Sequence, residues 1–148
     1  MRQISKWDYR FMDVARLVAS WSKDPRCKVG AVIVKDRRIL STGYNGFPRG
    51  LSDSLEQYSD RQFKNSHVVH AETNAIYNSP IQPKSCSMYC TFAPCLNCSL
   101  AIIQAGVTEV ICPTIVDGNW RANQEEAKAY MKEAKLSIVE IPEPEYMI

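Results

Sequence analysis

The stretch KVGAVIVKDRRILSTGYN, residues 28–45, is the part of the sequence that most directly indicates a fold class. Its two apolar runs, 28–34 and 39–45, are joined by the polar tripeptide 36–38, which is typical of an antiparallel hairpin. Three later segments are predicted as strands, at 87–92, 107–112 and 136–141. Because helical segments alternate with these strands, the sequence predicts a mixed sheet covered by helices, in a three-layer α/β domain.

The predicted helices are marked by their ends as well as by apolar spacing. In the first, Ser5 and Asp8 stand where a cap and a first-turn acid are expected, ahead of apolar residues that recur every three or four positions. A second helix follows His70 and stops before Pro80, which cannot continue it. Two more are predicted, at 96–105, closed by Gly106, and at about 124–134. The tail PEPEYMI, from residue 142, is broken by proline and predicted to be irregular.

Composition and charge describe an ordinary globular chain. With 148 residues, 45% apolar and 23% charged, the sequence fits one domain over residues 1–148. A net charge of +2, without basic runs interleaved with aromatic residues, argues against nucleic acid and anionic membranes as partners. No stretch approaches the roughly 18 apolar residues of a membrane span, and the N-terminus shows no apolar signal segment. We therefore expect a cytoplasmic protein (in the host cytosol if viral), whose six cysteines favour metal binding or free thiols over disulfides.

A histidine and a glutamate lie two positions apart in HVVHAETNAIYNSP, residues 67–80. Neighbours two apart on a regular helix point to opposite sides, so His70 and Glu72 converge only at a helix start, one near the cap and one in the first turn. In FAPCLNCSL, Cys95 and Cys98 stand three apart at the start of the next helix and therefore face the same side. Two helix starts thus offer one histidine and two cysteines.

Two interpretations of these residues stay open at this point. One His and two Cys suit Zn²⁺ and leave the fourth tetrahedral position for water, the mark of a catalytic zinc, with Glu72 placed to take a proton. Alternatively, Cys86 and Cys90 complete a structural four-cysteine site. Taken jointly, His-x-Glu followed by Pro-Cys-x-x-Cys is the signature of zinc-dependent nucleobase deaminases. The remaining cysteines, Cys27, Cys86, Cys90 and Cys112, are then expected to pack as small apolar residues.

The chain resembles the cytidine deaminase superfamily in HAETNAI and TFAPCLNC, and within it the deoxycytidylate (dCMP) deaminases in SKDPRCKVGAVIV, 22–34, and GYNGFPRG, 43–50. The likeness runs from about Trp7 to Ile141. It implies a five-stranded mixed sheet with helices on both faces and a homo-oligomer, often a hexamer. It also implies hydrolytic deamination of dCMP to dUMP and ammonia in pyrimidine nucleotide biosynthesis, supplying dUMP for thymidylate, with allosteric activation by dCTP and inhibition by dTTP.

The resemblance further implies roles for single residues. His70, Cys95 and Cys98 match the ligands of one catalytic Zn²⁺ per chain, and Glu72 matches the residue that shuttles protons to the pyrimidine N3 and the leaving amine. Substrate contacts are implied at Asn45, which matches a sugar contact, and at Arg26, Lys28, Ala71, Trp120 and Arg121, whose cations are either phosphate contacts or solvated surface charges. An allosteric nucleotide, with Mg²⁺ on its triphosphate, is expected at Asn45, Gly46, Phe47, Pro48 and Arg49.

Other functions with the same motifs also stay open. A tRNA adenosine deaminase shares the core, although the weak net charge and GYNGFPRG argue against it, and free cytidine deaminases commonly carry Cys in place of His70. A zinc-stapled binding module without turnover would fill the fourth position with another cysteine. Some relatives hold a second zinc through an insertion where this chain has only 51–67 and His67, so we predict one zinc. Thr73, often apolar in the family, is expected to be inconsequential.

Overall fold

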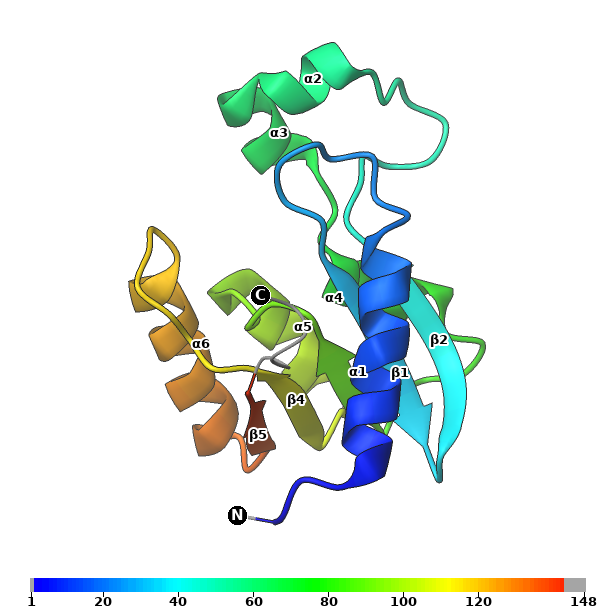
Figure 1. Ribbon diagram of the computed structural model, residues 1–148, viewed down its shortest axis with the longest axis vertical. Helices are drawn as coiled ribbons and strands as arrows, with labels where there is room; N and C mark the ends of the chain where they lie inside the picture. The colour runs from blue at the N-terminus through cyan, green and yellow to red at the C-terminus, as the bar shows by residue number, and fades with distance from the viewer. Residues whose placement is uncertain (1, 143–148) are drawn as a thin grey trace.

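The computed structural model describes residues 2–142, which fold around one five-stranded sheet in the order β2-β1-β3-β4-β5 (Figure 1). The strands are β1 (Gly30–Lys35), β2 (Arg38–Tyr44), β3 (Ser87–Cys90), β4 (Glu109–Pro113) and β5 (Ser137–Ile141). β1 pairs antiparallel with β2 and β3, whereas β3, β4 and β5 run parallel. The predicted mixed sheet is confirmed; the tail predicted to be irregular lies, from residue 143, outside the described residues.

The predicted hairpin closes through a two-residue turn. Asp36 and Arg37 have φ values of 51° and 61°, as a type I′ turn requires, and Lys35 pairs with Arg38 across it. This turn matches the twist of the flanking strands and fixes their register as far as Val34, beyond which the pairing shifts by one residue. Beyond it, Ala31 and Ile33 point to one face of the sheet while Val32 and Val34 point to the other, so β1 is buried on both sides.

Helices cover both faces of the sheet. α1 (Lys6–Ala19) begins with a capping box between Ser5 and Asp8 and packs on the face that carries Val32 and Val34. The opposite face is covered by α4 (Ala71–Asn78), α5 (Leu96–Ala105) and α6 (Arg121–Glu133). These bounds agree with the predicted helices to within a few residues, and the three-layer α/β/α architecture is confirmed.

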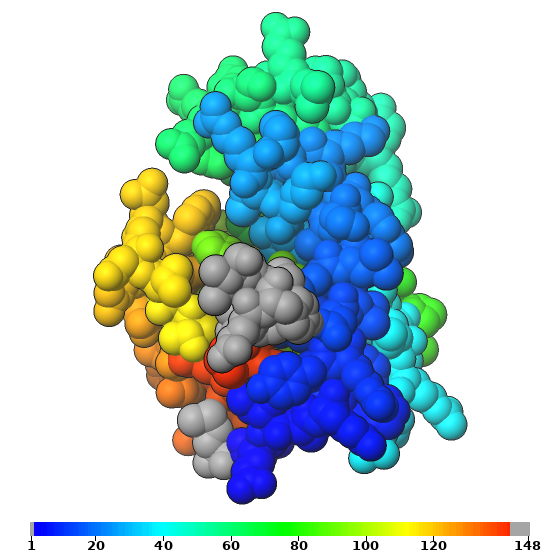
Figure 2. Space-filling model, viewed as in Figure 1, coloured from blue at the N-terminus to red at the C-terminus, as the bar shows by residue number. Residues whose placement is uncertain are grey.

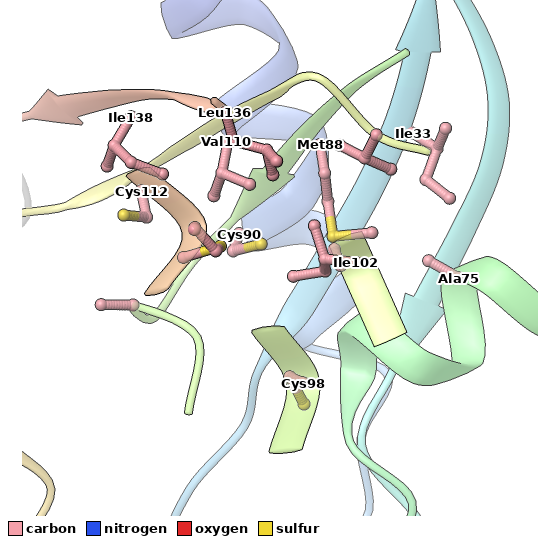
Figure 3. Packing of buried hydrophobic residues seen from close by; sticks show 14 of the residues in the cluster. Ile33, Ala75, Met88, Cys90, Cys98, Ile102, Val110, Cys112, Leu136 and Ile138 are labelled. Carbon is pink, nitrogen blue, oxygen red and sulfur yellow. The ribbon is translucent and has the colours of Figure 1, made fainter. Parts of the chain in front are cut away.

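The core beneath α4 and α5 is apolar and closely packed. Figure 3 shows Met88, Val110 and Ile138 pointing from the strands toward the layer where Ile102 of α5 and Ala75 of α4 lie. All these side chains are at most 8% exposed. Burying such side chains contributes about 1.5–3 kcal/mol each for the larger ones, which holds the starts of α4 and α5 against the sheet.

Two short helices, α2 (Leu55–Ser59) and α3 (Arg61–His67), form a lobe at one end of the sheet (Figure 1, top) that the sequence pattern did not predict. Ser54 makes a capping box with Gln57, and the Asp60 carboxylate caps α3. Both helices are too short and too polar to show an apolar period, which is why only their caps signal them. Across residues 2–142, no helix has the length and apolar character that crossing a bilayer requires.

Candidate metal and catalytic site

Two residues of the site lie at the N-cap positions of their helices. His70 precedes α4 and Cys95 precedes α5, both with extended backbone, and neither side chain caps its own helix. Glu72 and Cys98 follow in the first turns. The convergence of His70 with Glu72, which regular helical spacing would forbid, is therefore achieved by placing the histidine just outside the helix.

The three predicted ligands meet at one point. The Nδ1 atom of His70 lies 3.5 Å from Cys95 Sγ and 3.3 Å from Cys98 Sγ. The three ligand atoms lie within 4.8 Å of one another, and no other group of three such residues occurs in the described part of the chain. With Zn–S near 2.3 Å and Zn–N near 2.0–2.1 Å, a tetrahedral N–S edge is about 3.6 Å. The separations observed are close to this edge, so the residues fit a zinc ion.

The other cysteines lie apart from this group. Cys86, Cys90 and Cys112 are buried in the sheet region, as expected of small apolar side chains, and none belongs to the ligand cluster. Within residues 2–142 the structure thus places no further cysteine with Cys95 and Cys98, as a structural four-cysteine site would require. The prediction for Cys27 is wrong, because this residue is exposed and lines the pocket described below instead of packing in the core.

The site perturbs the acidity of its own groups. Burial raises the pKa of Glu72, which is 4% exposed. Hydrogen bonding from the Cys98 thiol, helped by His70, lowers the pKa of Cys95 to about 4, and the same contact with burial raises the pKa of Cys98. The hydrogen bond with Cys95 raises the pKa of His70. The lowered pKa of Cys95 favours the thiolate, which is the form of cysteine that binds a metal ion.

A pocket of about 100 Å³ opens onto the site. Figure 2 shows the recess between the lobe of α2 and α3, the segment after α1, and the segment near residue 118. Its lining comes from six parts of the chain and comprises Asp24, Cys27, Val29, Asn45, Lys64, Asn65, Val68, His70, Ala71, Glu72, Phe92, Ala93, Cys95 and Trp120. The buried Glu72 and two of the three ligands thus face the same space.

The predicted substrate contacts separate into two groups. Asn45, Ala71 and Trp120 line the pocket, whereas Arg26, Lys28 and Arg121 are exposed and outside its lining. The Asn45 amide donates to the Cys27 carbonyl at 2.8 Å, and its Oδ1 accepts from the Val29 amide at 2.9 Å, so it also holds the pocket wall. Arg121 forms an ion pair with Asp117.

Lys64, absent from the predicted set, is the only Lys or Arg among the lining residues of the described chain. Its Nζ forms a salt bridge with Asp24 Oδ2 at 3.0 Å. The Lys64 side chain is 12% exposed and that of Asp24 is 1% exposed. Asp24 also accepts hydrogen bonds from the amides of Arg26 and Cys27. No sequence motif pairs residues 40 positions apart, and only the fold brings this lysine to the pocket.

The stretch expected to bind an allosteric nucleotide is joined to the histidine ligand. Gly46 and Val69 exchange backbone hydrogen bonds of 3.0 and 2.8 Å, immediately before His70. The next residues are Phe47, whose ring lies 4.5 Å from that of Tyr58, then Pro48, then Arg49, which is exposed and donates to Asn78 at 2.8 Å. Gly46 therefore anchors the chain that leads into α4, whereas Phe47 contacts α2 and Arg49 contacts the end of α4.

His67 and Thr73 lie near the site, and only Thr73 contacts a predicted metal ligand. His67 stacks on Phe63 with ring centroids 4.0 Å apart and does not belong to the ligand cluster. Thr73 was expected to be inconsequential, but its Oγ1 lies 3.9 Å from Cys98 Sγ. A hydroxyl at this distance can donate weakly to a thiolate ligand.

Comparison with known proteins gives one family. The family model described as the cytidine and deoxycytidylate deaminase zinc-binding region matches residues 5–114. An uncharacterized deaminase in the luxG 3′ region of Aliivibrio fischeri is 48% identical over 110 residues, which cover 74% of each chain. The deoxycytidylate deaminase of Mus musculus is 45% identical over 113 residues, covering 72% of this chain but only 64% of the mouse enzyme, which is less than two thirds of its length.

A solved structure extends the likeness to nearly the whole chain. The dCMP deaminase of cyanophage S-TIM5, in complex with dCMP and dUMP, superposes with a TM-score of 0.77 and 28% sequence identity. The match covers 95% of this chain and 100% of the cyanophage chain.

Proposed function

Since the chain belongs to the family of cytidine and deoxycytidylate deaminases, we propose that it catalyses the hydrolytic deamination of dCMP to dUMP and ammonia. Family membership and the cytidine deaminase fold, both predicted from sequence, are confirmed by these matches and by the cyanophage structure. The observation that carries the proposal is the buried Glu72 carboxyl, which faces the same pocket as His70 and Cys95.

The residues of the site divide the chemistry between them. His70, Cys95 and Cys98 would hold zinc through one imidazole and two thiolates, and the bound ion would supply the Lewis acidity that activates water. Glu72 takes a proton from the attacking water and delivers it to the pyrimidine N3 as the new C–O bond forms at C4. It then takes the proton of the new C4 hydroxyl and delivers it to the amine, so that the C4 carbonyl forms, the C4–N bond breaks and ammonia leaves.

Burial suits Glu72 to this work. A carboxyl whose pKa is raised by desolvation holds a proton more firmly than one in water and can still give it to an amine. The carboxyl is 4% exposed yet lines the pocket, so it can exchange a proton with a molecule bound there. Ala71, beside it in the lining, leaves room for the pyrimidine ring next to the carboxyl.

The remaining lining residues would orient the nucleotide. We propose that Asn45 contacts the sugar, that Trp120 walls the ring, and that Lys64 adds a phosphate contact to the predicted Arg26, Lys28 and Arg121. The basis for adding Lys64 is its place in the lining, where its ammonium group is paired with the Asp24 carboxylate. A phosphate dianion would be attracted by a cation that is largely removed from water.

The experiment compares wild type with Glu72→Gln, measuring ammonia released from dCMP, cytidine and an adenosine-bearing tRNA anticodon arm, with zinc content determined in both proteins. We expect release from dCMP alone and a loss of at least about 10²–10⁴-fold in the variant, at unchanged zinc content. Release from the anticodon arm or from cytidine instead would overturn the substrate assignment. Zinc without release from any of the three would favour the binding module.

The phosphate contact has its own test. Lys64→Met should raise KM for dCMP by about tenfold or more, since a lost contact to a charged group is worth about 1.5–3 kcal/mol. Any turnover of deoxycytidine, which has no phosphate, should be the same in the variant and the wild type. Lys28→Met and Arg121→Met test, in the same assay, the two exposed cations that are also proposed to contact the phosphate. If Lys28→Met raises KM and Lys64→Met does not, the phosphate lies at the pocket rim.

Regulation and assembly belong to the same proposal. We propose that the chain forms a homo-oligomer, a hexamer in the predicted form, and supplies dUMP for thymidylate in the cytoplasm. Residues 45–49 would bind dCTP as activator or dTTP as inhibitor with Mg²⁺, and Gly46 would carry the effect to His70 through its pairing with Val69. Light scattering gives the subunit number, and unchanged dCTP and dTTP responses in Arg49→Ala would remove that residue from the regulatory site.

A further inference from the structure

The start of α5 is held from outside the helix. Its N-cap residue, Cys95, makes no side-chain cap, because its sulfur points to the ligand cluster. The amide of Leu96, the first residue of α5, donates instead to Asn123 Oδ1 of α6 at 2.7 Å. A residue that is both N-cap and metal ligand cannot do the work of a capping side chain, and a neighbouring helix supplies that acceptor.

The next residue of α6 holds the other side of Cys95. Gln124 is 3% exposed, and its Nε2 donates to the Ala93 carbonyl at 2.8 Å. The two bonds are therefore made to the main chain two residues before and one residue after Cys95. Between them lies Pro94, which has no amide hydrogen with which to anchor the segment.

We propose that Asn123 and Gln124 are positioning residues for Cys95, fixing the main chain on both sides of it so that its Sγ lies within ligand distance of His70 and Cys98. The inference rests on the zinc site of the proposed function, but not on its substrate. Partners that orient ligands in this way typically change metal affinity by about 10–100-fold when they are removed.

The same turn of α6 also contributes to the pocket. Trp120, the N-cap residue of α6, lines the pocket, and its ring lies 6.5 Å from the His70 ring in an edge-on arrangement. One helical turn therefore carries a pocket wall and the two anchors of a ligand. Substitutions in this turn should affect metal binding more than the packing of the sheet, because α6 contacts the sheet chiefly at β5.

The test uses the full chain loaded with Zn²⁺ or Co²⁺. Asn123→Ala removes the acceptor, and Asn123→Asp retains one. Asn97→Ala is the control, because Asn97 is an exposed asparagine in the first turn of α5, next to Leu96. Zinc retention is measured by competition with a chromophoric chelator, and the geometry of the site by the thiolate-to-cobalt absorption band. We expect about 10–100-fold weaker retention and an altered band in Asn123→Ala, recovery in Asn123→Asp, and wild-type values in Asn97→Ala.

Gln124→Met, which keeps the volume of the side chain but removes the donor, should weaken retention in the same direction. Retention and cobalt spectra equal to wild type in both Asn123→Ala and Gln124→Met would overturn the proposal, even if both variants unfold more easily. Wild-type protein that binds zinc but does not deaminate dCMP would instead overturn the substrate assignment and leave this inference standing.

Discussion

The two helix starts that carry the metal ligands are held in different ways. The chain before His70 is held by main-chain hydrogen bonds between Val69 and Gly46, whereas the chain around Cys95 is held by the side chains of Asn123 and Gln124. Main-chain bonds persist when a side chain is changed, but a side-chain bond is lost with a single substitution. The histidine end should therefore be sensitive to backbone space and the cysteine end to side-chain chemistry.

Among changes near the start of α4, a substitution at Gly43 is expected to have the largest effect. A Cβ there would lie 2.3 Å from the backbone nitrogen of Ala75 and 2.4 Å from the carbonyl oxygen of Ala71, both in α4. Because neither atom can move without the helix, Gly43→Ala should lower the free energy of unfolding by about 3 kcal/mol or more and abolish activity, as seen by urea unfolding and ammonia release.

Gly46→Ala is the matched control for that change. A Cβ at Gly46 would meet only Tyr58 Oη at 3.5 Å, an ordinary contact, and the pairing with Val69 does not use a side chain. We expect near wild-type stability and metal retention. If Gly43→Ala were as stable as Gly46→Ala, α4 would not depend on close approach to β2.

Asp8 of α1 lies outside both helix starts, so a substitution there should lower the stability of the fold without displacing the predicted metal ligands. Burial alone would raise the pKa of Asp8, but hydrogen bonds from Arg2, the Ser5 amide and Tyr89 lower it from 3.8 to about 2. Since the folded pKa lies below the unfolded one, the stabilisation is complete above about pH 4 and is lost as the pH falls toward 2. It amounts to about 2 kcal/mol.

Asp8→Asn should therefore lower the free energy of unfolding by about 2 kcal/mol at pH 7 and flatten its pH dependence between 4 and 2, with zinc retention unchanged. Urea unfolding across that range measures both. Asp53→Asn removes an exposed ion pair with Lys23 and should change stability by less than about 1 kcal/mol. A pH profile of Asp8→Asn that parallels wild type would show that other carboxyls carry the acid sensitivity.

A smaller effect is expected at Asn74, which tests how redundant the histidine end is. Its side chain donates to the Tyr44 carbonyl at 2.8 Å and approaches the Val69 carbonyl at 3.5 Å. Asn74→Ala should lower the free energy of unfolding by about 1 kcal/mol and leave metal retention near wild type, because Gly46 still pairs with Val69. Retention as weak as in Asn123→Ala would remove the distinction between the two helix starts.

The smallest effect is expected at Thr73. Thr73→Val keeps the shape of the side chain but removes the hydroxyl 3.9 Å from Cys98 Sγ. We expect zinc retention to weaken by less than about tenfold, below the effect of Asn123→Ala. The cobalt absorption band reports the contact directly, and an unshifted band would return Thr73 to the inconsequential role predicted from sequence.

Local signals in the sequence predicted the frame of the molecule and the meeting of the ligands. The hairpin, the capping box at Ser5 and the helix ends at Pro80 and Gly106 all depend on residues close together in the chain. Likewise, the placement of the ligands at two helix starts follows from spacings of two and three.

Contacts between distant segments could not be predicted in this way. Lys64 reaches Asp24 across 40 residues, and Asn123 reaches Leu96 across 27, without any motif that joins them. Free cysteine usually packs in a core, which is the basis of the prediction for Cys27, but the side chain is exposed and lines the pocket. Sequence spacing thus predicted which residues lie together at the candidate site, while the residues that contact them from distant segments emerged only from the fold.

The separation of 25 positions between His70 and Cys95 has a consequence for the unfolded chain. The unfolded chain does not hold these two residues together, so the free energy with which an ion would bind between them would add to the free energy of folding. Metal loss would then shorten the lifetime of the folded protein as well as stop its chemistry. The abundance of the protein in a cell would follow the supply of zinc.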